Sequence, residues 1–373
     1  MSTMTSTQIA PFTPIDHFEG PDLGSTPAAQ LRRIRAEAPM FADWFRATGQ
    51  VDLFAARSLV TLPYPRRFAL WDACTAPVPY VWMTNRMFVI RWREDGRTRT
   101  LLAEPSDYEL GLNTPFLLRT IERLPMRRER ALDAFFTRRG RIVRHLSAMR
   151  IAPQDVDYLA FDHLHTQDIR RLVGTEGPAP DLGYADSPVP ALFPNARMIL
   201  QPDELEHVRD VHPFQARFHQ SGTYGTVRRE ALLPVEGDVL VAPGLAFLRT
   251  PGHTFGNQTL VVNTARGIFT SSENGIAVEC YAPERSRLPG VRKWAAREGL
   301  EVVMNFNTPE FASWQYNSMI KEKLIADPIP GRPELPQVFP SSELTRHRLA
   351  PGIRPIHEHG DLTVGEVEGS DGR

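Results

Sequence analysis

Cysteine is scarce in this sequence, since the 373 residues include only Cys74 and Cys280. Two thiols so far apart make no disulfide framework, and the lack of any CxxC pair excludes a zinc site built on cysteine. We therefore expect both side chains to behave as small buried apolar residues. A small secreted domain held together by several disulfide bonds is excluded.

A dominant charge and a long apolar run are lacking as well. Lys plus Arg number 43 and Asp plus Glu number 44, so the formal net charge is −1. This balance gives no support for a nucleic-acid partner or an anionic membrane surface. No segment approaches the roughly 18 apolar residues that span a bilayer, and the N-terminus has no signal-peptide pattern. We expect a cytoplasmic protein with no nucleic-acid or membrane partner.

Apolar residues make up 42% of the chain, enough for a sizeable core. Strand-like and helix-like patterns interleave along it, and residues 87–92 lead through an Asp-Gly turn to residues 98–103, which predicts a hairpin. This pattern is typical of an α/β protein with two mixed sheets flanked by helices. The 33 prolines gather near both ends and in residues 174–194, where they predict extended loops.

Three histidines carry the chemical signal. His163 and His165 follow directly on a short buried strand predicted at residues 158–161, where side chains at the end of a strand often form a site. His253 stands in the sequence Thr-Pro-Gly-His-Thr, and the Pro-Gly pair favours a sharp turn that presents the imidazole. Neutral imidazole is a common ligand for zinc, and three histidines leave one coordination position open for chemistry.

These motifs resemble those of the metallo-β-lactamase superfamily. Residues 155–168 are similar to its lead-in strand and HxHxDH motif, residues 193–197 to its FPNA segment, and residues 248–257 to its TPGHTPGH block. The resemblance runs from about residue 78 to residue 311. It implies an αββα sandwich of two mixed β-sheets flanked by helices. It also divides the chain into an N-terminal extension (1–75), a metallo-β-lactamase-like domain (76–325) and a proline-rich tail (326–373).

The sequence departs from the family pattern at the second metal position. Gln167 and Asp168 replace the Asp and second His of the motif, Ser272 replaces the bridging aspartate with Glu273 beside it, and Asn307 replaces the last histidine. Only oxygen donors remain there, so we expect a single ion held by the three histidines. Zinc is the expected metal, with iron or manganese as alternatives.

The resemblance implies a metal-dependent hydrolase that acts on a small molecule through activated water. Asp168 or Glu273 is the candidate general base, although Asp168 also suits the cap of a helix at Ile169 and Glu273 also suits a solvated turn. Asp162 is a candidate to orient His165 or His253 from behind. Two alternatives stay open: a mononuclear iron enzyme of oxygen or redox chemistry, and a ligand-binding protein without turnover.

Further candidates lie outside these motifs. His219 and Tyr224 fall in the insertion at residues 202–233, where they are candidates to contact substrate or are plain loop residues. A second HxH pattern, His357-Glu358-His359, lies in the proline-rich tail, which favours a surface position or one folded back over the site. Both chain ends are expected to pack on the core, where they narrow the entrance or build a homodimer interface.

Overall fold

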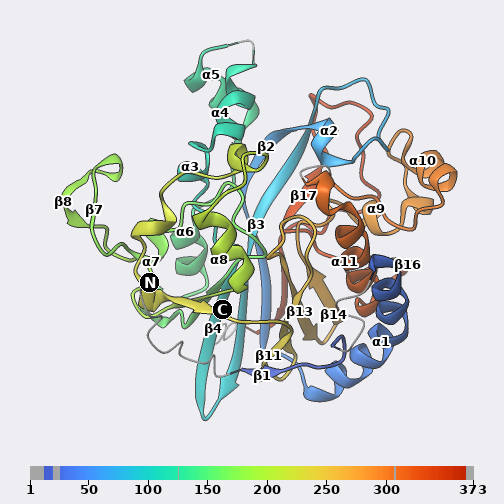
Figure 1. Ribbon diagram of the computed structural model, residues 1–373, viewed down its shortest axis with the longest axis horizontal. Helices are drawn as coiled ribbons and strands as arrows, with labels where there is room; N and C mark the ends of the chain where they lie inside the picture. The colour runs from blue at the N-terminus through green and yellow to red at the C-terminus, as the bar shows by residue number, and fades with distance from the viewer. Residues whose placement is uncertain (1–11, 20–25, 125, 306–307, 367–373) are drawn as a thin grey trace, which may run out of the picture.

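The computed structural model describes residues 12–19, 26–124, 126–305 and 308–366. Two β-sheets lie face to face in the middle of the molecule, and helices cover their outer faces (Figure 1). This is the αββα sandwich that the sequence predicts. None of the helices in the described ranges is long and apolar enough to cross a bilayer.

The larger sheet contains nine strands. They are β2 (Leu53–Pro65), β3 (Tyr80–Glu94), β4 (Arg97–Ala103), β5 (Thr137–Arg138), β6 (Tyr158–Ala160), β9 (Arg197–Leu200), β10 (Leu232–Pro234), β17 (Ser342–Thr345) and β18 (Leu362–Gly365). The order is β10-β9-β6-β4-β3-β2-β18, with β17 paired to β3 and β5 to β2. The β3–β4 hairpin confirms the predicted one. Because β4, β6, β9 and β10 run parallel, the ends of several strands meet at one edge of the sheet.

The smaller sheet is antiparallel throughout. In the order of the sheet, its strands are β1 (Thr13–Pro14), β11 (Val239–Ala242), β12 (Leu245–Arg249), β13 (Gln258–Thr264) and β14 (Gly267–Ser271). Two short hairpins lie apart from the sandwich, β7 (Pro178–Ala179) with β8 (Tyr184–Pro188) and β15 (Pro328–Ile329) with β16 (Arg332–Pro336).

The described residues include eleven α-helices. They are α1 (Pro27–Thr48), α2 (Arg66–Ala69), α3 (Tyr108–Gly111), α4 (Pro115–Glu122), α5 (Arg128–Phe135), α6 (Ile142–Ala148), α7 (Arg170–Val173), α8 (Pro202–Arg209), α9 (Val278–Tyr281), α10 (Val291–Glu298) and α11 (Ala312–Ile325). Helices α6, α7 and α8 cover the larger sheet, and α1 and α11 cover the smaller one (Figure 1).

Strand β2 shows why its sequence forms an interior strand. Leu53 and Ala55 pack under the helices, whereas Phe54 and Ala56 face the other sheet, as the two-residue period of a strand requires. The ring of Phe54 lies 5.6 Å from that of Phe88 and 5.1 Å from that of Phe269 on β14. Burying each such ring contributes roughly 1.5–3 kcal/mol, so this cluster fixes one sheet on the other.

Both chain ends take part in the sandwich. Helix α1 packs its Phe41 and Phe45 against the outer face of the smaller sheet. Strand β17 pairs with β3, and β18 pairs with β2, so the proline-rich end of the chain adds two strands to the larger sheet. The side chain of His359, in the second HxH pattern, is 5% exposed, and its Nδ1 lies 2.8 Å from Oε1 of Glu343. It therefore lies inside the fold.

Candidate metal centre

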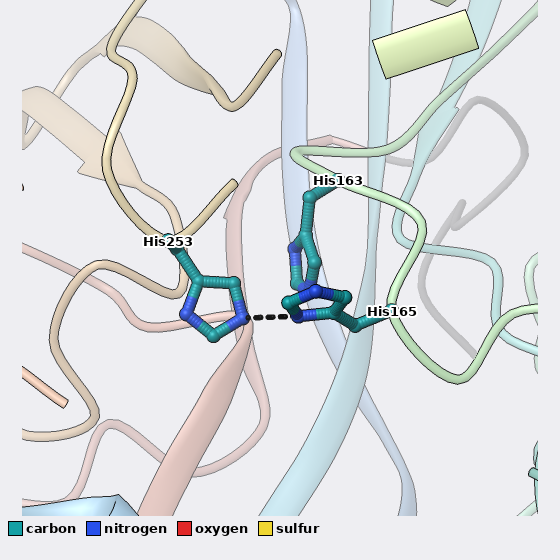
Figure 2. A group of neighbouring side chains, drawn as sticks. All are labelled: His163, His165 and His253. Carbon is teal, nitrogen blue, oxygen red and sulfur yellow. Dashed lines mark hydrogen bonds between the residues drawn. The ribbon is translucent and has the colours of Figure 1, made fainter. Parts of the chain in front are cut away.

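Two loops bring the three histidines together. His163 and His165 follow the end of β6, and His253 lies in the turn between β12 and β13. One nitrogen of each imidazole lies within 4.8 Å of one nitrogen of the others, and all three residues are at most 4% exposed. Figure 2 shows the rings converging from opposite sides. Within the described ranges, no other group of three His, Cys, Asp or Glu residues is arranged to hold a metal ion.

The spacing of the nitrogens suits a metal ion. Nδ1 of His165 lies 3.1 Å from Nε2 of His253. Two ligands at about 2.0–2.1 Å from a tetrahedral zinc ion lie about 3.3 Å apart, so little movement is needed to admit one. Three buried imidazole nitrogens at this spacing form a donor set that fits a borderline ion such as zinc.

The protonation of the imidazoles is compatible with ligation. Burial lowers the pKa of His165 and of His253 well below the ordinary value, which keeps both rings neutral. Burial also acts to lower the pKa of His163, but Asp162 outweighs it and raises that pKa to about 9. Because a metal binds the neutral ring, an ion at this cluster would displace a proton from His163.

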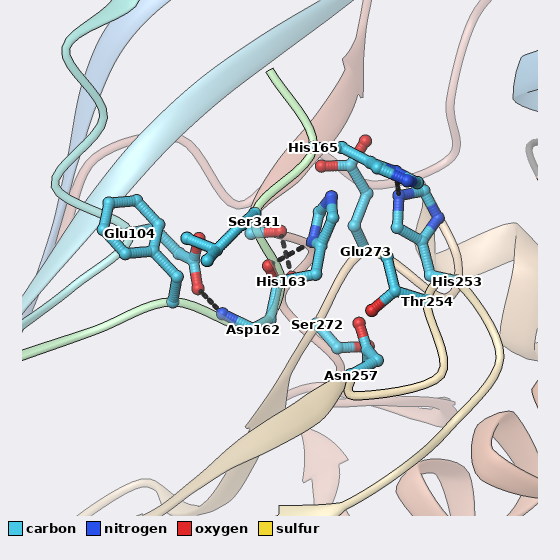
Figure 3. A network of polar contacts seen from close by, with 12 residues as sticks. Glu104, Asp162, His163, His165, His253, Thr254, Asn257, Ser272, Glu273 and Ser341 are labelled. Atoms are coloured by element: carbon cyan, nitrogen blue, oxygen red, sulfur yellow. Dashed lines mark hydrogen bonds and ion pairs between the residues drawn. The ribbon is translucent and has the colours of Figure 1, made fainter. Parts of the chain in front are cut away.

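Asp162 is the carboxylate that orients His163. Its Oδ1 lies 2.5 Å from Nδ1 of His163, and its Oδ2 accepts a 2.8 Å hydrogen bond from the hydroxyl of Ser341 (Figure 3). The backbone N–H of Asp162 donates to Oε1 of Glu104 at 2.6 Å. Glu104 is buried at the end of β4 with a positive φ of 56°. The sequence predicted that Asp162 would orient His165 or His253, but its contact is with His163.

The turn that carries His253 is held from behind. The backbone N–H of His253 donates to Oδ1 of Asn274 at 3.1 Å, and Nδ2 of Asn305 lies 2.7 Å from Nδ1 of the His253 ring. Gly252 has a φ of +156°, and a Cβ there would lie 2.3 Å from the backbone of Gln315. Sequence reasoning chose Asn307 in this segment. Asn307 lies outside the described residues. The side chain in this segment that contacts the ring of His253 is that of Asn305, two positions earlier, and sequence reasoning missed it.

Ser272, at the position that resembles the family's bridging aspartate, is bound to a buried carboxylate on α11. Its hydroxyl donates to Oε1 of Glu322 at 2.7 Å. The same buried carboxylate also accepts hydrogen bonds from Thr259, Asn274 and Tyr281. Glu322 was missed by sequence reasoning because it lies on α11 without any motif around it. Its role is to fix the Ser272–Asn274 loop beside the histidines.

Glu273 is the predicted carboxylate that reaches the pocket over the histidines. It lines that pocket together with the three imidazoles and Gln167. Burial raises the pKa of Glu273 to about 7, while His163 acts in the opposite direction. A carboxyl group with such a pKa exchanges a proton readily near neutral pH.

The other predicted residues do not line this pocket. Asp168 accepts hydrogen bonds from the guanidinium of Arg170, the shortest at 2.7 Å, and from the backbone N–H of Arg170. The hydroxyl of Tyr224 donates to the carbonyls of Leu164 and Gln167. His219 is buried with its ring centre 4.9 Å from that of His165, and it is not among the residues that line the pocket.

The pocket walls are mostly apolar. One wall is a face of the larger sheet, and the other is formed by α4 with the neighbouring residues of α3 and by Phe218. The apolar lining residues are Val60, Leu62, Tyr64, Met83, Leu112, Phe116, Leu117 and Phe218. An apolar chain that extends from the histidine cluster would be covered on two sides, and water would be excluded around it.

Comparison with known proteins gives partial likenesses. No family model matches the chain. A curated N-acyl homoserine lactonase from Bacillus sp. is 28% identical over 136 residues, which are 35% of this chain and 42% of that protein. The chain thus matches less than half of the length of that relative.

Several solved structures are similar. One is a dizinc quorum-quenching lactonase in complex with the product N-hexanoyl-L-homoserine, at a TM-score of 0.48 and 11% identity over 85% of this chain and 95% of that one. A probable metal-dependent hydrolase from Staphylococcus aureus has a TM-score of 0.46 and 13% identity over 74% and 83% of the two chains. A B. thuringiensis protein with N-decanoyl-L-homoserine bound at its active site has a TM-score of 0.44 and 17% identity over 67% and 87%.

The sandwich of two sheets flanked by helices, with three buried histidines gathered at the strand ends, is the αββα arrangement of the metallo-β-lactamase fold. The fold class and the resemblance predicted from the sequence are both confirmed.

Proposed function

We propose that the protein is a metal-dependent hydrolase that opens a lactone or a related ester carrying an apolar chain. The observation that carries this proposal is the convergence of three buried imidazoles and Glu273 at the base of one apolar-walled pocket. The partial likeness to an N-acyl homoserine lactonase supports the lactone as the first substrate class to test.

One ion held by His163, His165 and His253 is proposed. A divalent ion there would supply Lewis acidity, polarise the carbonyl and lower the pKa of water towards about 7. Two of the groups that would hold a second ion are committed elsewhere, since Asp168 pairs with Arg170 and Ser272 donates to Glu322. These contacts support a mononuclear centre.

The chain's own residues would divide the remaining work. Glu273, at the pocket base, takes the proton of the attacking water and returns it to the leaving oxygen. Asp162 holds the ring of His163 in one orientation. The apolar walls position the substrate's chain and exclude bulk water, which strengthens the electrostatic contacts inside the pocket.

The test is hydrolysis of N-hexanoyl-L-homoserine lactone by protein purified without chelator, followed by proton release and by mass spectrometry of the product. We expect ring opening that is lost after dialysis against a chelator and restored by zinc, with about one equivalent bound per chain. The control is His253→Ala, which removes one ligand. Ring opening at an unchanged rate by His253→Ala would contradict the proposal, and iron rather than zinc in anaerobically purified protein that opens no lactone would favour the redox alternative.

A further inference from the structure

One face of the larger sheet lines the pocket, and on β2 and β3 this face is apolar except for one side chain. Val60 and Leu62 on β2 and Met83 and Asn85 on β3 all line the pocket, because alternate residues of a strand share a face. Asn85 is the polar residue in this otherwise apolar group. It pairs with Ser342 on β17, which also lines the pocket.

The side chain of Asn85 has an acceptor oxygen that receives no hydrogen bond. Its Oδ1 is buried and has no hydrogen-bond partner within the protein. Buried polar atoms in folded proteins are nearly always paired, so an exception inside a pocket points to a group supplied from outside the chain. A carbonyl oxygen accepts and cannot donate, which means that the missing group is an N–H or O–H donor.

The position of Asn85 along the pocket indicates which part of a ligand it meets. Ser342, Glu273 and His163 line the same pocket, and both Ser342 and His163 act to lower the pKa of the Glu273 carboxyl group. Asn85 is the cross-strand neighbour of Ser342, and such paired side chains lie about 4.5–5.5 Å apart. Two residues further along β3, Met83 begins the apolar wall. Asn85 therefore lies between the base of the pocket and its apolar part.

We propose that Asn85 is a specificity-determining residue whose Oδ1 accepts a hydrogen bond from an amide N–H that joins the substrate's reacting group to its apolar chain. This inference rests on the proposed function for the identity of the reacting group. Ser106, whose buried Oγ also lacks a partner and lines the same pocket, is placed to hold a second polar group of the ligand.

The experiment compares two lactones that differ in one atom. One is N-hexanoyl-L-homoserine lactone, and the other has oxygen in place of the amide nitrogen, which keeps the carbonyl and removes the N–H. Because a buried acceptor left unpaired is costly, we expect the wild type to prefer the amide by about 10-fold to 100-fold in kcat/KM for ring opening. In Asn85→Leu the ratio of kcat/KM for the amide to kcat/KM for the oxygen analogue should fall to near one. Asn85→Asp keeps an acceptor oxygen and should retain a preference for the amide.

Met83→Leu is the matched control, since it changes the same face of the same strand without altering a polar group, and its ratio should equal that of the wild type. An undiminished preference in Asn85→Leu would overturn the inference. If neither lactone is opened, calorimetry with N-hexanoyl-L-homoserine and its oxygen analogue on zinc-loaded protein separates the two proposals. A binding preference for the amide that Asn85→Leu abolishes supports this inference while the proposed function fails, and equal binding of the two probes overturns it.

Discussion

The hydroxyl of Ser341 donates a 2.8 Å hydrogen bond to Oδ2 of Asp162, although 179 positions separate the two residues in the sequence. The other oxygen of Asp162 contacts the ring of His163. The loop that carries Ser341 leads into β17, so the C-terminal part of the chain reaches the contacts directly behind the metal cluster (Figure 3). Such outer contacts fix the orientation and tautomer of a ligand imidazole.

Replacing Asp162 should weaken metal binding without unfolding the protein. Asp162→Asn keeps the size of the side chain but removes the negative charge that faces His163, so we expect zinc affinity to fall by about 10-fold to 100-fold. Competition with a chromophoric chelator measures it. Ser341→Ala should have a smaller effect in the same direction.

Asp361→Asn is the control for that change, because Asp361 also accepts hydrogen bonds but from Ser58, on the larger sheet. Its zinc affinity should equal that of the wild type. If Asp162→Asn bound zinc as tightly as Asp361→Asn does, the assigned role of Asp162 would be wrong.

The sequence predicted those parts of the structure that depend on neighbouring residues. The β3–β4 hairpin follows from an Asp-Gly turn between apolar runs, and the histidine cluster follows from two local motifs in a familiar order. Residues whose role depends on strand pairing or helix packing had no local signal. Ser341, Glu322 and Asn85 reach the site only because β17 pairs with β3 and α11 packs behind the His253 turn.

The proline-rich end of the chain shows most clearly what local sequence patterns cannot predict. Proline density predicted extended loops there, but the segment also forms β17 and β18, which pair with β3 and β2. What the sequence did not indicate was a partner for this segment. Glu343 is buried between Arg86 and His359, and these contacts join residues from β3, β17 and the last loop. Their proximity is a property of the assembled sheet.

Glu273→Gln should reduce catalysis while leaving the metal in place. The amide keeps the shape of the side chain but accepts no proton, so we expect kcat to fall by about 10²-fold to 10⁴-fold with zinc content unchanged. Since burial raises the pKa of Glu273 to about 7, the reactive carboxylate forms as pH rises, and the wild-type rate should increase with pH. A bound cation would shift this increase to lower pH. Rates across pH 5–9 measure it.

Gln167→Ala is the comparison for Glu273→Gln, because Gln167 lines the same pocket without a titratable group. That variant should keep the pH dependence of the wild type. If the rate of Glu273→Gln increased with pH as the wild-type rate does, the proton transfer would have to be assigned to another group.

A methyl group at Gly252 should damage the metal cluster through the backbone. At a φ of +156° the added Cβ would lie 2.3 Å from the backbone of Gln315, so either the turn or α11 has to move. Because His253 is the next residue, we expect Gly252→Ala to lose zinc and to lower the melting temperature. Zinc content and thermal unfolding measure the two effects. Gly225→Ala, where an added Cβ meets nothing within 4 Å, is the control that should change neither.

The buried Arg86–Glu343–His359 cluster should make stability depend on acid pH. Burial acts to raise the pKa of Glu343, but Arg86 and His359 outweigh it and lower the pKa from 4.5 to about 2. A carboxyl group whose pKa is lower in the folded state stabilises the fold above its ordinary pKa and loses that contribution as pH falls. The difference corresponds to a contribution on the order of 3 kcal/mol at neutral pH, lost between about pH 5 and pH 2.

Glu343→Gln should therefore be less stable than the wild type at pH 7 by on the order of 3 kcal/mol, with the gap narrowing as the pH falls towards 2. Urea unfolding in the presence of chelator measures it, since removing the metal removes the pH dependence of metal binding, and the buried histidines that remain affect both proteins alike. Glu129→Gln changes an exposed glutamate and should follow the wild-type curve at every pH. A constant gap between Glu343→Gln and the wild type from pH 7 to pH 2 would show that the lost contact is not the ionised carboxylate, and the cluster would then stabilise the C-terminal strands by packing alone.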